Sequence, residues 1–191
     1  MGKGRLEAFS DGVIAIIITI MVLDLKVPHE TSLAALRPVV PPLLCYILSF
    51  MFVGIYWNNH HHLLHATQKV NGAVLWANLH LLFWLSLVPF ATGWMGENHF
   101  SSVTVAAYGA VLLMAAIAFT ILSRALIVFH GEGSSLATAI GDDRKGKTSV
   151  ALYVIAIACA RVNPWISVAL YVCVALIWFV PDRRLERAPA P

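Results

Sequence analysis

Charged residues are scarce in this sequence. Asp, Glu, Lys and Arg together make up 12% of its 191 residues, whereas a soluble domain carries about 25%. Apolar residues make up 59% and fall in long blocks. A water-soluble globule needs a charged surface, which so few charges cannot supply. The composition therefore excludes a soluble domain and predicts an all-α integral membrane protein, because each span in hydrocarbon must satisfy its own backbone hydrogen bonds.

Cysteine is also rare. Cys45, Cys159 and Cys173 all lie inside apolar blocks, and their spacing fits neither a disulfide framework nor a zinc motif. We interpret them as small packing residues and expect no metal site built on them. The net charge of +3 is too small to indicate a nucleic-acid partner. The basic start is only Lys3 and Arg5, and the first apolar block continues into more membrane, so we expect no cleavable signal peptide.

Six apolar blocks predict six transmembrane helices. They span about 8–25, 39–57, 70–90, 102–128, 149–162 and 163–180. Pro41 and Pro42 suit the first turn of the second helix, and the third is expected to end near Pro89. The stretch 131–147 is interpreted as the only real loop. We predict one transmembrane domain over residues 1–181, followed by a short cytoplasmic tail at 182–191.

The distribution of Lys and Arg predicts the orientation. With the amino terminus inside, ten of them fall on the cytoplasmic side, and only Lys26, Arg37 and Arg161 fall outside. Loops rich in Lys and Arg stay in the cytoplasm. Both termini are therefore expected to be cytoplasmic, as an even number of spans requires.

The first block is bounded by carboxylates. Asp11 and Asp24 are thirteen steps apart, about 20 Å of helix, whereas the hydrocarbon core is about 30 Å thick. Ionised groups at membrane depth usually face protein or water, which favours a sheltered position for this helix. The alternative is a tilted or thinned span whose two carboxylates simply reach the two interfaces.

One stripe of this block is aliphatic. Ile16, Thr19, Ile20 and Leu23 follow i, i+3, i+4, i+7 spacing and share a helix face. A stripe of branched aliphatic residues is far more often a packing surface than a pore. The pattern alone does not distinguish the two.

Three motifs resemble one known family. Residues 5–11 read R-x-x-x-F-S-D, from Arg5 through Phe9, Ser10 and Asp11. Residues 57–61 read W-N-N-H-H, and 76–78 read W-A-N, followed by L-V-P-F at 87–90. In this order and on these blocks, they resemble the transmembrane protein 175 family of lysosomal-type potassium channels and their prokaryotic relatives. The resemblance covers the first half of the chain by motif and the second half only by hydropathy.

The resemblance implies a channel selective for potassium over sodium that lacks the T-V-G-Y-G filter, and no such sequence occurs here. It implies a homotetramer of six-helix subunits in the plasma membrane of a prokaryote, with one pore lined by the first helices. No cofactor is implied, because potassium is the permeant ion. Carried over to this sequence, the pore-facing residues are Ile16, Ile20 and Leu23, with Thr19 beside them. Their ring would form a hydrophobic constriction that gates by dewetting.

The motif residues have a second interpretation, which the predicted topology supports. His60, His61 and Asn78 lie near the cytoplasmic ends of the second and third blocks, level with Asp11. Hydrogen bonds between helices at this level, with Arg5 and Ser10 completing the set, would position the first helix. We therefore expect Asp11 to belong to an architectural clamp rather than to an ion-binding site.

The histidine cluster permits an alternative function. His61 and His65 have the i, i+4 spacing of a metal-ligand pair, so a divalent-metal or proton-coupled transporter could use the cluster from His60 to His65. His-His-x-x-His also resembles one box of the membrane di-iron oxygenases, which need about eight histidines on one side. The remaining histidines are dispersed along the sequence: His29, His80, His99 and His130. We therefore expect no enzyme.

Overall fold

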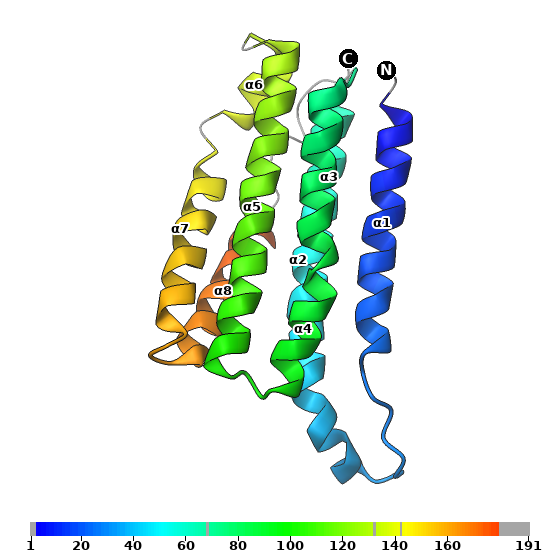
Figure 1. Cartoon of the computed structure of the whole chain (residues 1–191), viewed down its shortest axis with the longest axis vertical. Coiled ribbons are helices and arrows are strands. Elements are labelled where there is room, and N and C mark those ends of the chain that lie inside the picture. Colours follow the sequence, from blue (N-terminus) through cyan, green and yellow to red (C-terminus); the bar gives the residue numbers. More distant parts are fainter. Residues whose placement is uncertain (1–2, 68, 132, 142, 180–191) are drawn as a thin grey trace.

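The computed structural model describes residues 3–67, 69–131, 133–141 and 143–179. Its long helices run side by side along the long axis of the molecule (Figure 1). In chain order the elements are α1 (Gly4–Leu23), the 3₁₀ helix η1 (Leu33–Val39), α2 (Val40–His65), α3 (Gly72–Ser86), α4 (Val88–Glu97), α5 (Ser102–His130), α6 (Ser135–Ile140), α7 (Arg144–Cys159) and α8 (Pro164–Phe179). The tail predicted at 182–191 lies outside the described residues.

The six predicted blocks fall mainly on α1, α2, α3 with α4, α5, α7 and α8. Four helical runs are long and apolar enough to cross a membrane: Gly4–Leu23, Leu33–His65, Gly72–Glu97 and Ser102–His130. α7 and α8 are shorter, at 16 residues each. The chain is therefore an all-α membrane protein with at least four membrane-length helices.

The third span does not end at Pro89, contrary to the prediction. Leu87 closes α3 and opens α4, which continues to Glu97 with Pro89 in its first turn. Proline is tolerated there because the first-turn N–H groups have no partner within the helix. The proline therefore interrupts the helical hydrogen bonding for one turn without ending the span.

The stretch 131–147 is not a plain loop, which corrects a second prediction. It contains α6 and the first turn of α7, each opened by a side-chain cap. The Ser134 hydroxyl accepts a hydrogen bond from the backbone N–H of Ala137, and the Asp143 carboxylate accepts one from Gly146. Such caps satisfy N–H groups that the helix itself leaves unpaired.

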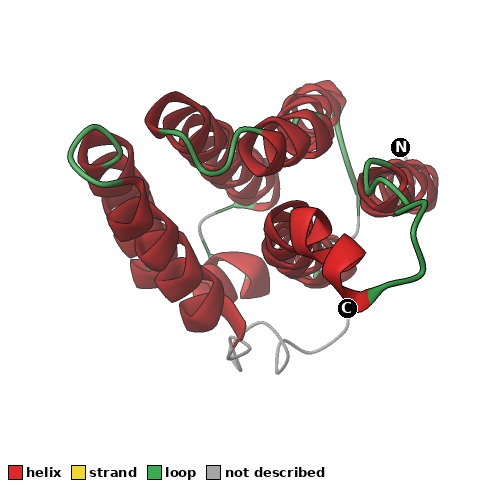
Figure 2. Ribbon diagram, turned by 90° about the horizontal axis from the view of Figure 1, so that it is seen from below, coloured by secondary structure: helices red, strands yellow, loops and turns green. Residues whose placement is uncertain are grey.

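The core lies in two clusters along the bundle. One joins α1, α2, α3 and α5 through residues such as Ile14, Leu81 and Leu122. The other joins α2, α4, α5, α7 and α8 around Tyr108 and Tyr171. Figure 2 shows α1 at one edge of the bundle, away from the α7 and α8 pair. One face of α1 is therefore left without a covering helix from its own chain.

Candidate ion pathway and interhelical network

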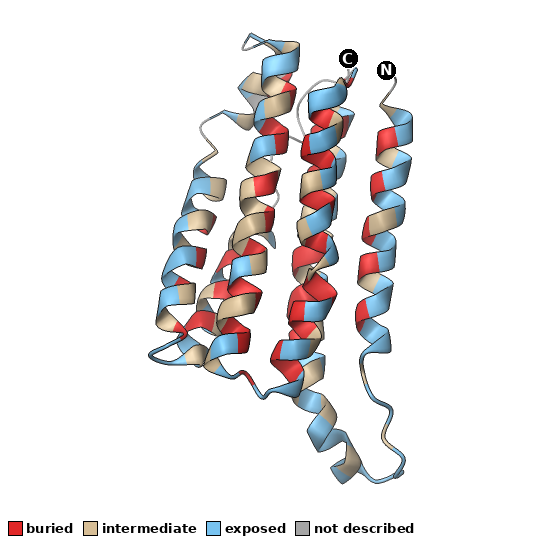
Figure 3. Cartoon of the chain, viewed as in Figure 1, coloured by how far each residue is buried: buried red, intermediate tan, exposed pale blue. Residues whose placement is uncertain are grey.

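α1 has one packed face and one bare face (Figure 3). Ile14, Ile17 and Met21 are buried against the neighbouring helices, with 1%, 4% and 2% of their surface exposed. These positions follow i, i+3, i+7 spacing, which fixes how the helix is rotated against α2 and α3. Every residue of the opposite stripe is consequently turned away from the core of its own chain.

The aliphatic stripe predicted from the sequence lies on this bare face. Ile16, Ile20 and Leu23 are 57%, 44% and 78% exposed. Thr19 is exposed beside them, and its hydroxyl donates to the carbonyl oxygens of Ala15 and Ile16, both at 3.0 Å. The three aliphatic side chains make a continuous apolar surface, and the threonine hydroxyl is held by its own helix.

A groove runs along the carboxy-terminal half of α1. It has a volume of about 830 Å³ and separates the stripe from α4, with Phe90 and Trp94 on its far wall. Asp24 caps α1 at this end, and its carboxylate faces the backbone of α4 near Gly93. Just beyond, Lys26 Nζ lies 2.7 Å from Glu97 Oε1, and this hydrogen-bonded ion pair raises the pKa of Lys26. The groove thus combines apolar walls with the charged groups of Asp24, Lys26 and Glu97 at one end.

A buried chain of hydrogen bonds joins α1, α2 and α3 at the other end of the bundle. The Asn78 amide nitrogen donates to Ser10 Oγ at 3.0 Å, and the Asn78 oxygen lies 2.7 Å from His60 Nε2. His60 must therefore carry its proton on Nε2, because the Asn78 oxygen can only accept. The three residues are at most 1% exposed. Buried polar groups of this kind are costly unless they are paired, so the chain fixes the positions of three helices relative to one another.

Asp11 is held by a different residue from those expected. The indole N–H of Trp57 donates to Asp11 Oδ1 at 3.0 Å. His61 stacks on the Trp57 ring at 5.9 Å, and His65 stacks on His61 at 6.0 Å. The position of Trp57 at the start of the W-N-N-H-H motif is the sequence signal that could have identified it as the partner of Asp11.

The remaining motif residues are more exposed. Phe9 is 52% exposed on the bare side of α1. Arg5 is exposed and makes no hydrogen bond or ion pair with the described part of the chain. Lys3 instead reaches the end of α2, where its ammonium group donates to the carbonyl oxygens of Leu64 and His65 at 3.1 and 3.0 Å. A cation there offsets the negative end of the helix dipole, a role that no sequence motif indicates.

The histidines do not assemble a metal centre. Within the described residues, no three His, Cys, Asp or Glu side chains are grouped so that they could hold a metal ion. His60 is occupied by Asn78, and the His61 and His65 rings lie stacked at an interplanar angle of 17°. A lone i, i+4 pair offers two ligands, fewer than the three that catalytic zinc sites draw from the protein.

Comparison with known proteins gives a consistent set of matches. Residues 5–89 match the model of a family described as endosomal/lysosomal potassium channel TMEM175. The chain is 57% identical over 188 residues to a potassium channel of Chryseobacterium sp. (strain P1-3), covering 98% of each chain. It is 30% identical to a potassium channel of Chamaesiphon minutus, covering 91% of this chain and 90% of that protein.

A solved structure and an animal protein extend this set. The crystal structure of a lysosomal potassium-selective channel TMEM175 homolog from Chamaesiphon minutus superposes with a TM-score of 0.78 at 28% identity, over 94% of this chain and 97% of that one. The endosomal/lysosomal proton channel TMEM175 of Danio rerio is 38% identical over 96 residues, which cover 44% of this chain and 18% of that protein.

Proposed function

Because this chain belongs to the TMEM175 family of potassium channels, we propose that it conducts potassium in preference to sodium through a pore lined by α1. The family is one of ion channels rather than enzymes, which argues against reading the His-His-x-x-His sequence as part of an oxygenase. The proposed assembly is a homotetramer in a prokaryotic plasma membrane, with six spans per subunit and both termini in the cytoplasm. Four copies of α1 then surround one axis.

The observation that carries the proposal is the bare face of α1. Ile16, Ile20 and Leu23 expose about half or more of their side chains, although the same helix bears Asp11 about two turns after its start and is capped by Asp24 at its end. A helix with carboxylates so close together is poorly suited to facing lipid. Packing identical helices around an axis places the aliphatic stripe inside the assembly, where it no longer has to face lipid.

The stripe supplies the gate. Rings of isoleucine and leucine make a narrow, dry constriction in which an ion must shed water without receiving new ligands. Such constrictions close by dewetting and open when the helices spread or rotate. Thr19 lies in the same surface, but its hydroxyl hydrogen donates to its own helix. Only the oxygen lone pairs of Thr19 are therefore available to a passing cation, which suits a role in selection.

The polar network holds the pore helix at the right angle and depth. Ser10 is tied to α3 through Asn78, and Asp11 is tied to α2 through Trp57. Both contacts lie toward the amino-terminal end of α1, whereas the stripe extends toward the other end. We therefore assign the network to positioning rather than to ion binding, so that α1 can pivot about a fixed cytoplasmic end.

The deciding experiment is a planar bilayer recording of the purified protein under opposed potassium and sodium gradients. A reversal potential close to the potassium equilibrium value supports the proposal, and a reversal at zero refutes selectivity. A superimposed pH gradient separates potassium current from proton current. Saturable uptake that is coupled to protons or a divalent ion, without channel currents, would favour the transporter alternative.

A further inference from the structure

A second groove lies on the far side of the bundle, between α5 and the segment containing α6 and the start of α7. It has a volume of about 490 Å³, within the usual range of ligand pockets. Most of its surface is apolar, and five of its lining residues are aliphatic: Ile117, Ile121, Ile127, Ile140 and Val150. The proposed function assigns nothing to this groove.

Two cations line the same groove, each one turn from an aliphatic residue. On α5, Arg124 follows Ile121 by three residues, and on α7, Lys147 precedes Val150 by three. The two helices pack side by side and run in opposite directions (Figure 1). Arg124 and Lys147 therefore line the groove toward the end of the bundle that holds α6, and Ile121 and Val150 each lie one turn further from that end.

We propose that this groove binds an anionic phospholipid of the cytoplasmic leaflet. Its phosphate would lie between Arg124 and Lys147, and an acyl chain would follow Ile121 and Val150. Basic pockets between helices on the cytoplasmic side are the recognised setting for anionic headgroups. The site uses the orientation of the proposed function, but it does not depend on the pore.

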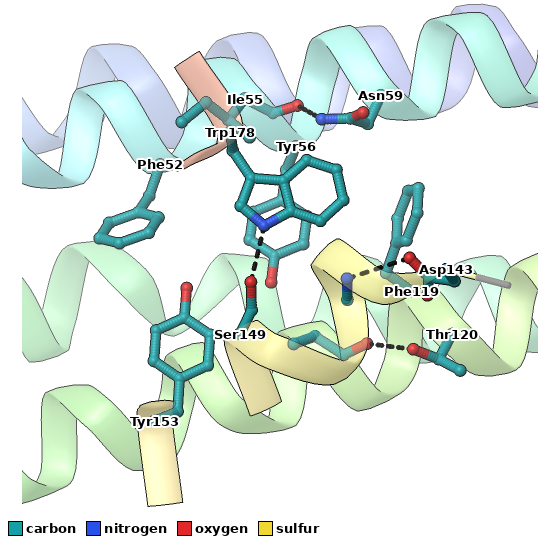
Figure 4. Close-up of a pocket in the computed structure, with 12 residues that line it drawn as sticks. Phe52, Ile55, Tyr56, Asn59, Phe119, Thr120, Asp143, Ser149, Tyr153 and Trp178 are labelled. Carbon is teal, nitrogen blue, oxygen red and sulfur yellow. Dashed lines mark hydrogen bonds between the residues drawn. The ribbon is translucent and has the colours of Figure 1, made fainter. Parts of the chain in front are cut away.

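One carboxylate also lines the groove, and it must be accounted for. Asp143 Oδ1 accepts a hydrogen bond from the backbone N–H of Gly146 at 3.0 Å, which caps α7. Figure 4 shows this bond at the edge of a small neighbouring cavity, so the carboxylate is directed at the helix start. The helix dipole offsets part of its charge. Among the described residues that line the groove, Arg124 and Lys147 carry two positive charges and Asp143 carries one negative charge, so this part of the lining has a net positive charge.

The aliphatic wall argues for a lipid rather than a free anion. Ile121 is 43% exposed, and an inorganic phosphate between the cations would leave the apolar part of the groove unfilled. In a bilayer that part is open to acyl chains, which fill it without an additional ligand. The phosphate of a phospholipid thus fits the cationic part of the groove, and its acyl chain fits the aliphatic part.

Native mass spectrometry of the full chain released from nanodiscs tests the proposal. The nanodiscs contain dioleoyl-phosphatidylcholine with an equal amount of dioleoyl-phosphatidylglycerol. The wild type should retain phosphatidylglycerol in preference to phosphatidylcholine. An R124Q/K147Q variant should bind it about 30-fold more weakly, since each Lys or Arg beside an anionic lipid contributes a factor of about five. Equal retention by the variant overturns the proposal.

Two controls separate this site from general charge and from a free anion. R161Q removes an exposed cation beyond the other end of α7 and should leave retention unchanged. I121W fills the aliphatic part while keeping both cations, and it should displace the lipid. If R161Q lowers retention as much as R124Q/K147Q, or if millimolar inorganic phosphate competes the lipid away, the groove is not a phospholipid site.

Discussion

The Nε2–H of His60 donates a hydrogen bond of 2.7 Å to the side-chain oxygen of Asn78, eighteen residues away on the next helix. The amide nitrogen of Asn78 in turn donates a hydrogen bond to Ser10 Oγ on α1. An asparagine is suited to this middle position because its amide offers both a donor and an acceptor. The position of α1 relative to α3 is consequently fixed by a hydrogen bond between two fully buried side chains.

Replacing Asn78 with alanine should destabilise the protein. The substitution leaves the buried His60 Nε2–H and Ser10 Oγ without their partner, which costs about 1–2 kcal/mol. For a chain of this length the thermal midpoint should fall by about 2–8 °C, measured by fluorescence unfolding in detergent. Asn58→Ala is the matched control, because Asn58 lies on α2 and makes no side-chain hydrogen bond with the described residues. An unchanged midpoint in Asn78→Ala would show that the chain of bonds adds nothing.

Asp11 and Trp57 should be energetically coupled. Asp11→Ala and Trp57→Phe each remove the 3.0 Å hydrogen bond between them, and Trp57→Phe keeps an aromatic ring to stack on His61. A double-mutant cycle on thermal stability should give a coupling of about 0.6–1.7 kcal/mol. In bilayers, Asp11→Ala should also lower the yield of tetramers or alter open probability. Additive effects in the cycle, with normal tetramer yield and current, would contradict the clamp.

Sequence reasoning predicted the family and the helices because their signals are local. Hydropathy blocks mark the four membrane-length helical runs directly, and the motif beginning at Arg5 lies within residues 5–89, which match the family model. That match, together with the bacterial relatives, confirms the resemblance. Potassium-channel function follows from the same relatives and was expected from the same motifs.

The errors came from features that depend on packing. Pro89 was expected to end a helix, but the span continues because neighbouring helices bury Val88 and Ala91 and hold the interrupted turn together. The choice of Trp57 as the partner of Asp11 depends on how α1 and α2 are rotated, and no residue pattern specifies that rotation. The caps at Ser134 and Asp143 were hidden because the surrounding residues are polar, as in an ordinary loop.

Replacing glycine with alanine should have opposite effects on stability at Gly109 and Gly54. A Cβ at Gly109 would collide with the hydroxyl of Tyr171, which donates to the Val105 carbonyl oxygen at 3.0 Å. Gly109→Ala should therefore push the buried tyrosine off its acceptor and cost about 1–3 kcal/mol. At Gly54 no atom lies within 4 Å of the added carbon, so Gly54→Ala should stabilise the helix by up to about 1 kcal/mol. Thermal unfolding of both variants measures the difference, and a Gly109→Ala midpoint at or above wild type would contradict the close contact.

The pore assignment makes its sharpest prediction at two isoleucines of α1. Ile20 is 44% exposed on the bare face, whereas Ile17 is 4% exposed and packs into the core. Ile20→Ser should hydrate the constriction and raise potassium current severalfold at equal protein density, because a dry ring opposes ion entry more strongly than a polar one. Ile17→Ser should instead lower thermal stability by about 2–4 kcal/mol through lost burial, with little gain in current per folded channel. If Ile20→Ser leaves the current unchanged while Ile17→Ser increases it, the opposite face of α1 lines the pore, and the assignment of the gate to Ile16, Ile20 and Leu23 is wrong.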